Sequence, residues 1–224
     1  MPTDALINVN GDSVQALEIL FLTTVLMLLP SLIIMMTSFT RYVVVFSFLR
    51  TAMGTQQTPP NMVLVGMALI LTLFTMSPTL AAINEEALVP YQAEEITQEE
   101  FFNRAQVPLK RFMSNWVELQ SMELYCNISG VDAPANNEEV VNLPLTVIIP
   151  AFVTTELKRA FITGFLLYIP FLLVDMLVAS TLMSMGMVML PPAMISTPFK
   201  LLLFILLDGW QLLFSTLVAG FNTG

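Results

Sequence analysis

Four long apolar runs dominate the pattern of hydrophobic and polar positions along the chain. They cover residues 19–40, 62–83, 160–183 and 199–221. Each is long enough to cross the roughly 30 Å hydrocarbon core of a bilayer as a helix, which takes about 20 residues. A shorter run at residues 143–153 contains Pro144 and Pro150, so we expect a partly buried connection there. The pattern predicts two hydrophobic helical hairpins, at residues 19–83 and 144–224, after an N-terminal segment at residues 1–18.

The segment between the hairpins, residues 84–143, is the one strongly polar part of the chain, with eleven acidic and three basic residues. Thr97, followed three residues later by Glu100, has the pattern of a capping box, which predicts the start of a helix. A second helix is expected from Pro108, a typical first-turn residue, to about Leu124. Its apolar stripe is interpreted as packing on the first of these helices, or alternatively as a docking face for a neighbouring subunit. The stripe consists of Leu109, Phe112, Met113 and Trp116.

Composition places the chain in a membrane or in a membrane-derived assembly. Hydrophobic residues make up 56% and charged residues 11%, and the mean hydropathy is +0.77, whereas a soluble domain has about a quarter of its residues charged. The net charge of −9 argues against nucleic acid as a partner. Without histidine and with one cysteine, the chain lacks a cysteine–histidine zinc site, a histidine-based catalytic triad and an internal disulfide. We expect no cofactor, no metal and no enzymatic activity.

The positions of the basic residues predict a topology. Arg41 and Arg50 flank the connection between the first two runs, which favours a cytoplasmic loop there and places residues 84–143 outside. Lys158 and Arg159 would then also lie outside. Basic residues near membrane spans are usually cytoplasmic, so four simple spans fit poorly. No lysine or arginine precedes the first run, so the charged start of a secretory signal is missing. The first run is then either a retained helix or follows a signal that was removed before this numbering begins.

Two charged residues interrupt the apolar runs of the second hairpin. Asp175 and Lys200 are at equal sequence distance from the Met187–Val188 bond, so a hairpin with its tip there would bring them together. An unpaired charge in such surroundings costs several kcal/mol, which favours a pair within one subunit or between neighbours. A proton relay or ion site is the functional alternative. Asp208 is a third such charge, and no second carboxylate lies near it in the sequence to support acid–base catalysis.

Methionine occupies every second position before a double proline, at Met183, Met185, Met187 and Met189. The alternation, Gly186 and the Pro191-Pro192 stop predict a turn between two helices and not a continuing helix. Methionine is unbranched, apolar and flexible, so it adapts to irregular gaps. The turn could simply cap a hairpin core. Several copies around one axis could instead form a soft apolar seal.

Ordered blocks over most of the chain carry a resemblance to a known family. They are MMTSFTRYVVVFSFLR at 35–50, GTQQTPPNMVL at 54–64, MSP at 76–78, IIPAFVTTELKRAF at 148–161, PFLLVDMLVAS at 170–180, MGMVMLPP at 185–192 and PFKLLLFILLDGWQLL at 198–213. Together they resemble the FliP/SctR family, export-gate proteins of flagellar and injectisome type III secretion. The resemblance covers residues 20–220 and weakens at 91–143.

The resemblance implies an assembly. Family members form a helical cone of five copies with one R-type and four Q-type subunits, with B-type and A-type subunits as further expected partners. Their hydrophobic helices are largely lifted out of the bilayer towards the periplasm, which would account for the unexpected position of Lys158 and Arg159. We therefore expect the chain in the bacterial inner membrane at the flagellar basal body, with the assembled core raised towards the periplasm.

The resemblance also assigns expected roles to individual residues. The methionine loop is expected to form a gasket at the constriction of the channel, through Met185, Met187 and Met189, with Met183 a less secure match. Asp175 and Lys200 match charges that bind helices and subunits together. Glu156, Lys158 and Arg41 match further polar positions at helix or subunit contacts.

The function expected from the sequence is that of an export-gate subunit that forms the entrance and constriction of the flagellar protein-export channel and guides unfolded substrates. The LLDGWQLL block favours the flagellar branch, whereas the loop before Pro59-Pro60 fits either branch. The alternatives are the same role in a virulence injectisome and a small-molecule or ion transporter that uses Asp175 and Lys200.

Overall fold

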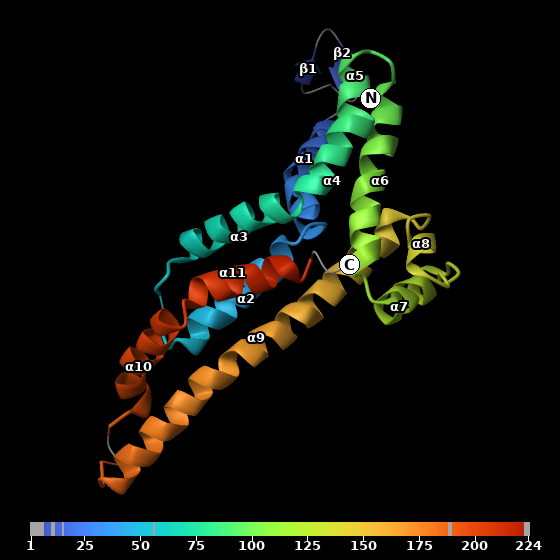
Figure 1. The fold of residues 1–224 in the computed structure, drawn as a ribbon. Helices are drawn as coiled ribbons and strands as arrows, with labels where there is room; N and C mark the ends of the chain where they lie inside the picture. Colours follow the sequence, from blue (N-terminus) through green and yellow to red (C-terminus); the bar gives the residue numbers. More distant parts are fainter. Residues whose placement is uncertain (1–6, 10–11, 15, 56, 188–189, 222–224) are drawn as a thin grey trace.

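The protein is helical almost throughout, which confirms the all-α prediction. A computed structural model describes residues 7–9, 12–14, 16–55, 57–187 and 190–221 (Figure 1). Near its start, a short antiparallel hairpin pairs β1 (Ile7–Val9) with β2 (Asp12–Val14), with Ile7 opposite Val14. The sequence pattern did not predict this hairpin.

Three of the four apolar runs are bent, which the sequence pattern did not predict. Their helices are α1 (Ala16–Met35) and α2 (Phe39–Ala52), α3 (Asn61–Thr75) and α4 (Ser77–Ile83), and α10 (Pro192–Leu206) and α11 (Gly209–Ala219). The bends measure 72°, 60° and 63° in that order, the second taken over α4 and its continuation to Gln92. Polar or helix-restricting residues lie at or beside the breaks, namely Thr37-Ser38, Pro78 and Asp208. Hydrophobicity shows the length of a run but not where its helix bends.

The long helix α9 (Leu145–Ser184) corrects a second expectation. Residues 143–153 are not a connection, because most of them form the first turns of this 40-residue helix, which continues through Pro150 and Pro170. Proline removes a helix hydrogen bond, but Ile148, Ala151 and Phe152 around Pro150 are fully buried, so packing offsets the loss. Among the described residues, α9 is the one unbent helix that is long and apolar enough to cross a membrane, and there are up to four candidate spans if each bent pair counts as one.

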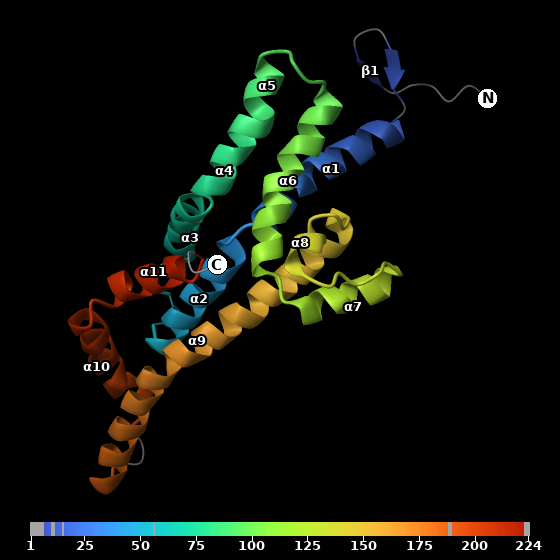
Figure 2. The same ribbon diagram turned by 45° about the vertical axis from the view of Figure 1, so that its right-hand side comes forward.

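The acidic segment forms a helical arm beside α9. The π-helix η1 (Asn84–Leu88) and α5 (Val89–Gln92) continue α4, and α6 (Gln98–Trp116) returns antiparallel to them; α7 (Leu119–Ser129) and α8 (Asn137–Val140) complete the arm (Figure 2). The predicted start of α6 is confirmed, because the Glu100 amide donates a 3.3 Å hydrogen bond to the Thr97 hydroxyl.

The prediction of a second helix that begins at Pro108 was wrong. Pro108 is buried inside α6, and the next helix begins only at Leu119. The apolar stripe also has different partners from those expected. The Phe112 ring lies 5.9 Å from that of Phe152 in α9, and Trp116 lies 5.1 Å from Phe221 at the end of α11. The stripe therefore joins the acidic segment to the second hairpin.

The core lies between α2 and α9. Tyr42, Val45, Phe46 and Leu49 recur at helical spacing on α2 and are fully buried. Gly164 of α9 allows the close approach, since a Cβ atom there would lie 2.5 Å from the Phe48 ring. The red helices α10 and α11 fold back from the far end of α9 along α2 (Figures 1 and 2). This arrangement leaves the connection between α9 and α10 at the tip of the molecule, away from the core.

Candidate functional site

A buried ion pair joins the first hairpin to the second. Arg41 of α2 donates from Nε to Glu156 Oε2 at 2.7 Å and from Nη2 to Oε1 at 2.5 Å, a two-point contact. The Glu156 side chain is 0% exposed and that of Arg41 is 7% exposed. The remaining Arg41 nitrogen, Nη1, lies 3.5 Å from the Gly220 carbonyl oxygen after α11. One guanidinium therefore holds α2, α9 and α11 together.

Aromatic rings enclose this ion pair. The Arg41 Cζ atom lies 3.7 Å from the centroid of the Phe221 ring and 5.9 Å from that of Trp116. Phe221 also contacts Tyr42 and Phe112, with ring centroids 5.7 and 5.9 Å apart. The rings separate the ion pair from solvent and add cation–π attraction to the guanidinium.

The second ion pair holds the α9–α10 hairpin closed. Lys200 Nζ donates to Asp175 Oδ2 at 2.6 Å, and Ser196 Oγ donates to Asp175 Oδ1 at 2.5 Å. The Lys200 side chain is 5% exposed and that of Asp175 is 29% exposed. The structure therefore brings together the two charges whose equal spacing from the loop suggested a pair. Ser196, one helical turn before Lys200, was missed because a hydroxyl in a helix has no distinctive sequence signal.

Lys158 differs from these buried charges because it lies at the surface. Its Nζ atom is 2.6 Å from Glu118 Oε2, and Arg159 Nε is 3.8 Å from the other Glu118 oxygen. The Glu118 amide also donates to Thr155 Oγ1 of α9 at 3.2 Å. Glu118 thus fixes the start of α7 against α9. The sequence could not distinguish it from the other carboxylates of the acidic segment.

The described part of the methionine loop, up to Met187, forms a turn. Helix α9 ends at Ser184, and Gly186 has a φ of +76°, a conformation that glycine adopts without a Cβ penalty. The Met187 amide donates to the Leu182 carbonyl at 3.0 Å, and Pro191 precedes the first residue of α10. Met183, Met185 and Met187 are 66%, 69% and 44% exposed. Met189 lies outside the described residues.

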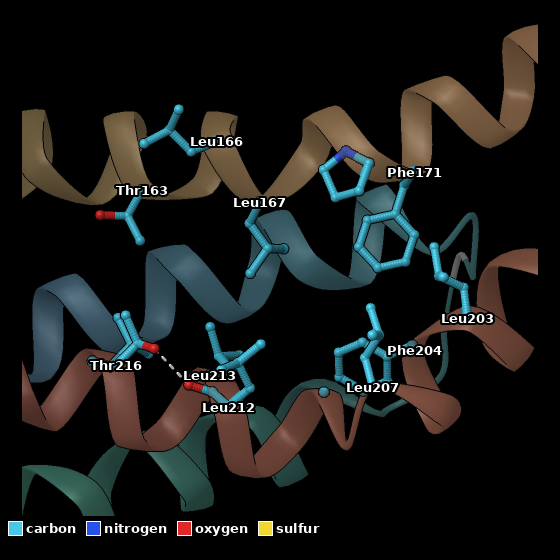
Figure 3. Close-up of a pocket in the computed structure, with 13 residues that line it drawn as sticks. Thr163, Leu166, Leu167, Phe171, Leu203, Phe204, Leu207, Leu212, Leu213 and Thr216 are labelled. Carbon is cyan, nitrogen blue, oxygen red and sulfur yellow. Dashed lines mark hydrogen bonds between the residues drawn. The ribbon is translucent and has the colours of Figure 1, made fainter.

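An apolar groove lies between α9 and the bent pair α10–α11. It encloses about 350 Å³, and Leu167 and Phe171 of α9 face Phe204 and Leu213 across it (Figure 3). Its lining contains no charged residue. Sequence reasoning missed this groove because its residues come from two apolar runs whose relative placement depends on the bend.

The described residues hold no cluster of three or more histidine, cysteine, aspartate or glutamate side chains that could bind a metal ion. The charges near the core instead join helices. These charges thus hold the helices in place, and an exposed apolar loop lies at the tip of the molecule.

Comparison with known proteins decides the family. The sequence profile described as the FliP family matches residues 22–217. The chain belongs to this family. It is 49% identical to the flagellar biosynthetic protein FliP of Bacillus subtilis over 207 residues, which cover 92% of each chain. The protein of the same name from Aquifex aeolicus is 48% identical over 213 residues, 95% of this chain and 89% of that protein.

FliP family membership makes the chain a protein of flagellar biosynthesis and confirms the family that the sequence motifs indicated. The FliP protein of Caulobacter vibrioides is 46% identical over 223 residues, which cover 97% of this chain and 83% of that protein. The profile match includes Arg41, Glu156, Asp175 and Lys200 as well as the methionine loop. The apolar helices agree with a membrane location for this FliP family member.

Proposed function

We propose that the chain is a core subunit of the flagellar type III export gate and that its methionine loop forms the constriction of the protein-export channel. The observation that carries this proposal is the position of the loop. Met183, Met185 and Met187 are exposed, and the end of α9 beside them lies at the tip of the molecule, away from the core (Figure 1). An apolar loop left uncovered within one chain is expected to have its partners in an assembly.

The proposed mechanism is passive guidance of an unfolded chain. Several copies of the loop that converge on one axis, five by resemblance, would surround the channel with flexible thioethers. Such a ring excludes ions because it offers few polar contacts, and it yields to side chains of different shapes because methionine changes rotamer easily. Since thioethers make few directional bonds, the ring would not retain the passing substrate.

The exposed apolar surface supports an assembly with other hydrophobic subunits, for which the family resemblance implies R-type and Q-type chains. At 40 residues, α9 is about 60 Å long, roughly twice the hydrocarbon thickness of a bilayer. A helix of that length extends well outside the membrane, in line with a core raised towards the periplasm of the inner membrane. In this proposal residues 84–143 form the periplasmic segment of the subunit, between hairpins at residues 19–83 and 144–224.

The buried charges support a structural role over the transporter hypothesis. A transporter would use Asp175 and Lys200 as an ion site. Here Asp175 already accepts from Lys200 and from Ser196, which leaves both carboxylate oxygens occupied. The injectisome alternative predicts the same geometry and differs only in the assembly that the subunit joins.

A methionine substitution tests the constriction. We expect the triple variant M185A/M187A/M189A to assemble normally but to raise ion leak through the complex in proteoliposomes, because alanine removes the side chains that close the ring. A matched control replaces three exposed methionines elsewhere, M27A/M62A/M176A, and is expected to leave ion leak unchanged. Equal leak from the loop variant, the control variant and the wild type would contradict the proposed constriction.

A further inference from the structure

The α2–α3 turn, which we define as Met53, Gly54 and Thr55, lies beside α10 of the second hairpin (Figures 1 and 2). Gly54 has a φ of +74°, a left-handed conformation that glycine adopts without a steric penalty. A Cβ atom on Gly54 would lie 3.0 Å from Thr197 Oγ1 and 4.0 Å from Lys200 Nζ. The turn therefore approaches α10 at the ion pair that closes the α9–α10 hairpin.

Contacts within the first hairpin fix this turn. Met53 is 3% exposed, and its amide donates to the Leu49 carbonyl at 3.0 Å. Thr55 Oγ1 donates to the Arg50 carbonyl at 3.3 Å, and the Arg50 side chain donates to the Asn61 side chain at the start of α3. A side chain added at position 54 would therefore displace α10 and not the turn.

Helix α10 is held along one narrow face. Its buried residues are Ser196, Lys200 and Phe204, which recur at every fourth position. Met194 and Phe199, on its other faces, are more than half exposed. An element with few buried contacts yields more readily than the core does. The methionine loop leads directly into α10, so a shift of α10 moves the loop with it.

We propose that the α2–α3 turn positions the methionine loop and that Gly54 is the positioning residue. Because glycine has no side chain, α10 lies close to the first hairpin and the α9–α10 hairpin keeps its angle. Close packing transmits a displacement, since a packed interior has few gaps to absorb it. The inference rests on the proposed function and deepens it, because it assigns to the constriction a residue outside the methionine loop.

The substitution G54A adds the one carbon atom that this contact excludes. We expect the assembled complex to leak more ions in proteoliposomes than the wild type, because Thr197 is displaced and the loop moves with α10. G130A is the matched control. Gly130 has a φ of +68°, so alanine is strained there as well, but no atom of the described chain beyond its neighbours lies within 4 Å of an added Cβ. Equal leak per complex from G54A, G130A and the wild type would overturn the proposal.

A second substitution tests whether the contact with Thr197 causes the leak. T197A removes the Oγ1 atom at 3.0 Å, and the remaining Cβ atom would lie 4.0 Å from a Cβ atom at position 54, an ordinary contact. We expect the double variant G54A/T197A to leak no more than T197A alone. Leak that persists in the double variant would refute the role of this contact, since backbone strain at position 54 would then account for it.

A disulfide tests the contact in the assembled complex. A Cβ atom on Gly54 would lie 4.0 Å from Thr197 Cβ, and disulfides join Cβ atoms about 3.5–4.5 Å apart. We expect G54C/T197C to form this disulfide in the complex without added leak; no disulfide there would overturn the proposal. The triple methionine variant M185A/M187A/M189A is measured in the same assay. If it leaks and G54A does not, only the positioning role fails, and if neither leaks, the proposed constriction fails as well.

Discussion

Removal of the Glu156 charge should destabilise the fold strongly. The substitution E156Q keeps the shape of the side chain but leaves the Arg41 guanidinium, 7% exposed and enclosed by Phe221 and Trp116, without its carboxylate. Loss of one partner of a buried ion pair costs about 3–5 kcal/mol. Folded proteins are stable by about 5–15 kcal/mol, so about a fifth or more of the free energy of unfolding would be lost.

Replacement of both charges should restore most of this loss. The double variant R41M/E156L exchanges the ion pair for apolar side chains of similar size, so no unpaired charge stays buried. Well-packed apolar replacements of buried ion pairs are often neutral or stabilising. We expect the double variant to be clearly more stable than E156Q, although it loses the Arg41 contact to the Gly220 carbonyl.

Unfolding in detergent micelles provides the assay. The centroid of the Trp116 ring lies 5.9 Å from the Arg41 Cζ atom. The variant W210F leaves Trp116 as the single tryptophan, so the fluorescence of the protein then reports on the surroundings of the ion pair. The control is E118Q, which breaks the exposed contact to Lys158 and should cost less than about 1 kcal/mol. If E156Q cost no more than E118Q, the buried ion pair would not hold the hairpins together.

Three further predictions concern other parts of the fold. D175A should reduce the yield of assembled complex, because it leaves Lys200 buried without its carboxylate at a cost of about 3–5 kcal/mol; an unchanged yield would exclude a role for this pair in assembly. Burial raises the pKa of the Cys126 thiol, so the folded protein should resist iodoacetamide at pH 8 and react after denaturation; fast labelling of the folded chain would show that α7 does not stay packed. T97A should destabilise α6 by about 1 kcal/mol, seen as faster hydrogen exchange in its first turn, whereas T97S should not; equal exchange in both would exclude the cap.

The sequence predicted the parts of the fold that depend on local chemistry. Thr97 marks a helix start because its hydroxyl reaches an amide three residues on, and Gly186 marks a helix end because of its positive φ. Pro108 and Pro150 led to two wrong predictions, a helix start at Pro108 and a connection around Pro150. Proline disfavours a helix interior locally, but both lie in helices whose buried neighbours pack on other elements, and the sequence does not show that packing.

The candidate site was predictable only where a pattern linked distant residues. Asp175 and Lys200 stood out because both are rare charges in apolar runs and lie symmetrically about a turn. Arg41 and Glu156 are 115 residues apart, and no spacing rule connects them, so only the resemblance indicated these positions. The enclosure by Phe221 depends on α11 folding back over α2, which the bend at Asp208 makes possible.

The central claim is that copies of the methionine loop converge on one axis together with other hydrophobic subunits. Native mass spectrometry of the complex that copurifies when the chain is expressed with the other export-gate subunits tests this claim most directly. The account predicts a particle in which this chain contributes about 125 kDa, five times its mass of 24.9 kDa, together with smaller hydrophobic chains. A monomer or dimer free of such chains would contradict it and would leave the methionine loop as the cap of a hairpin.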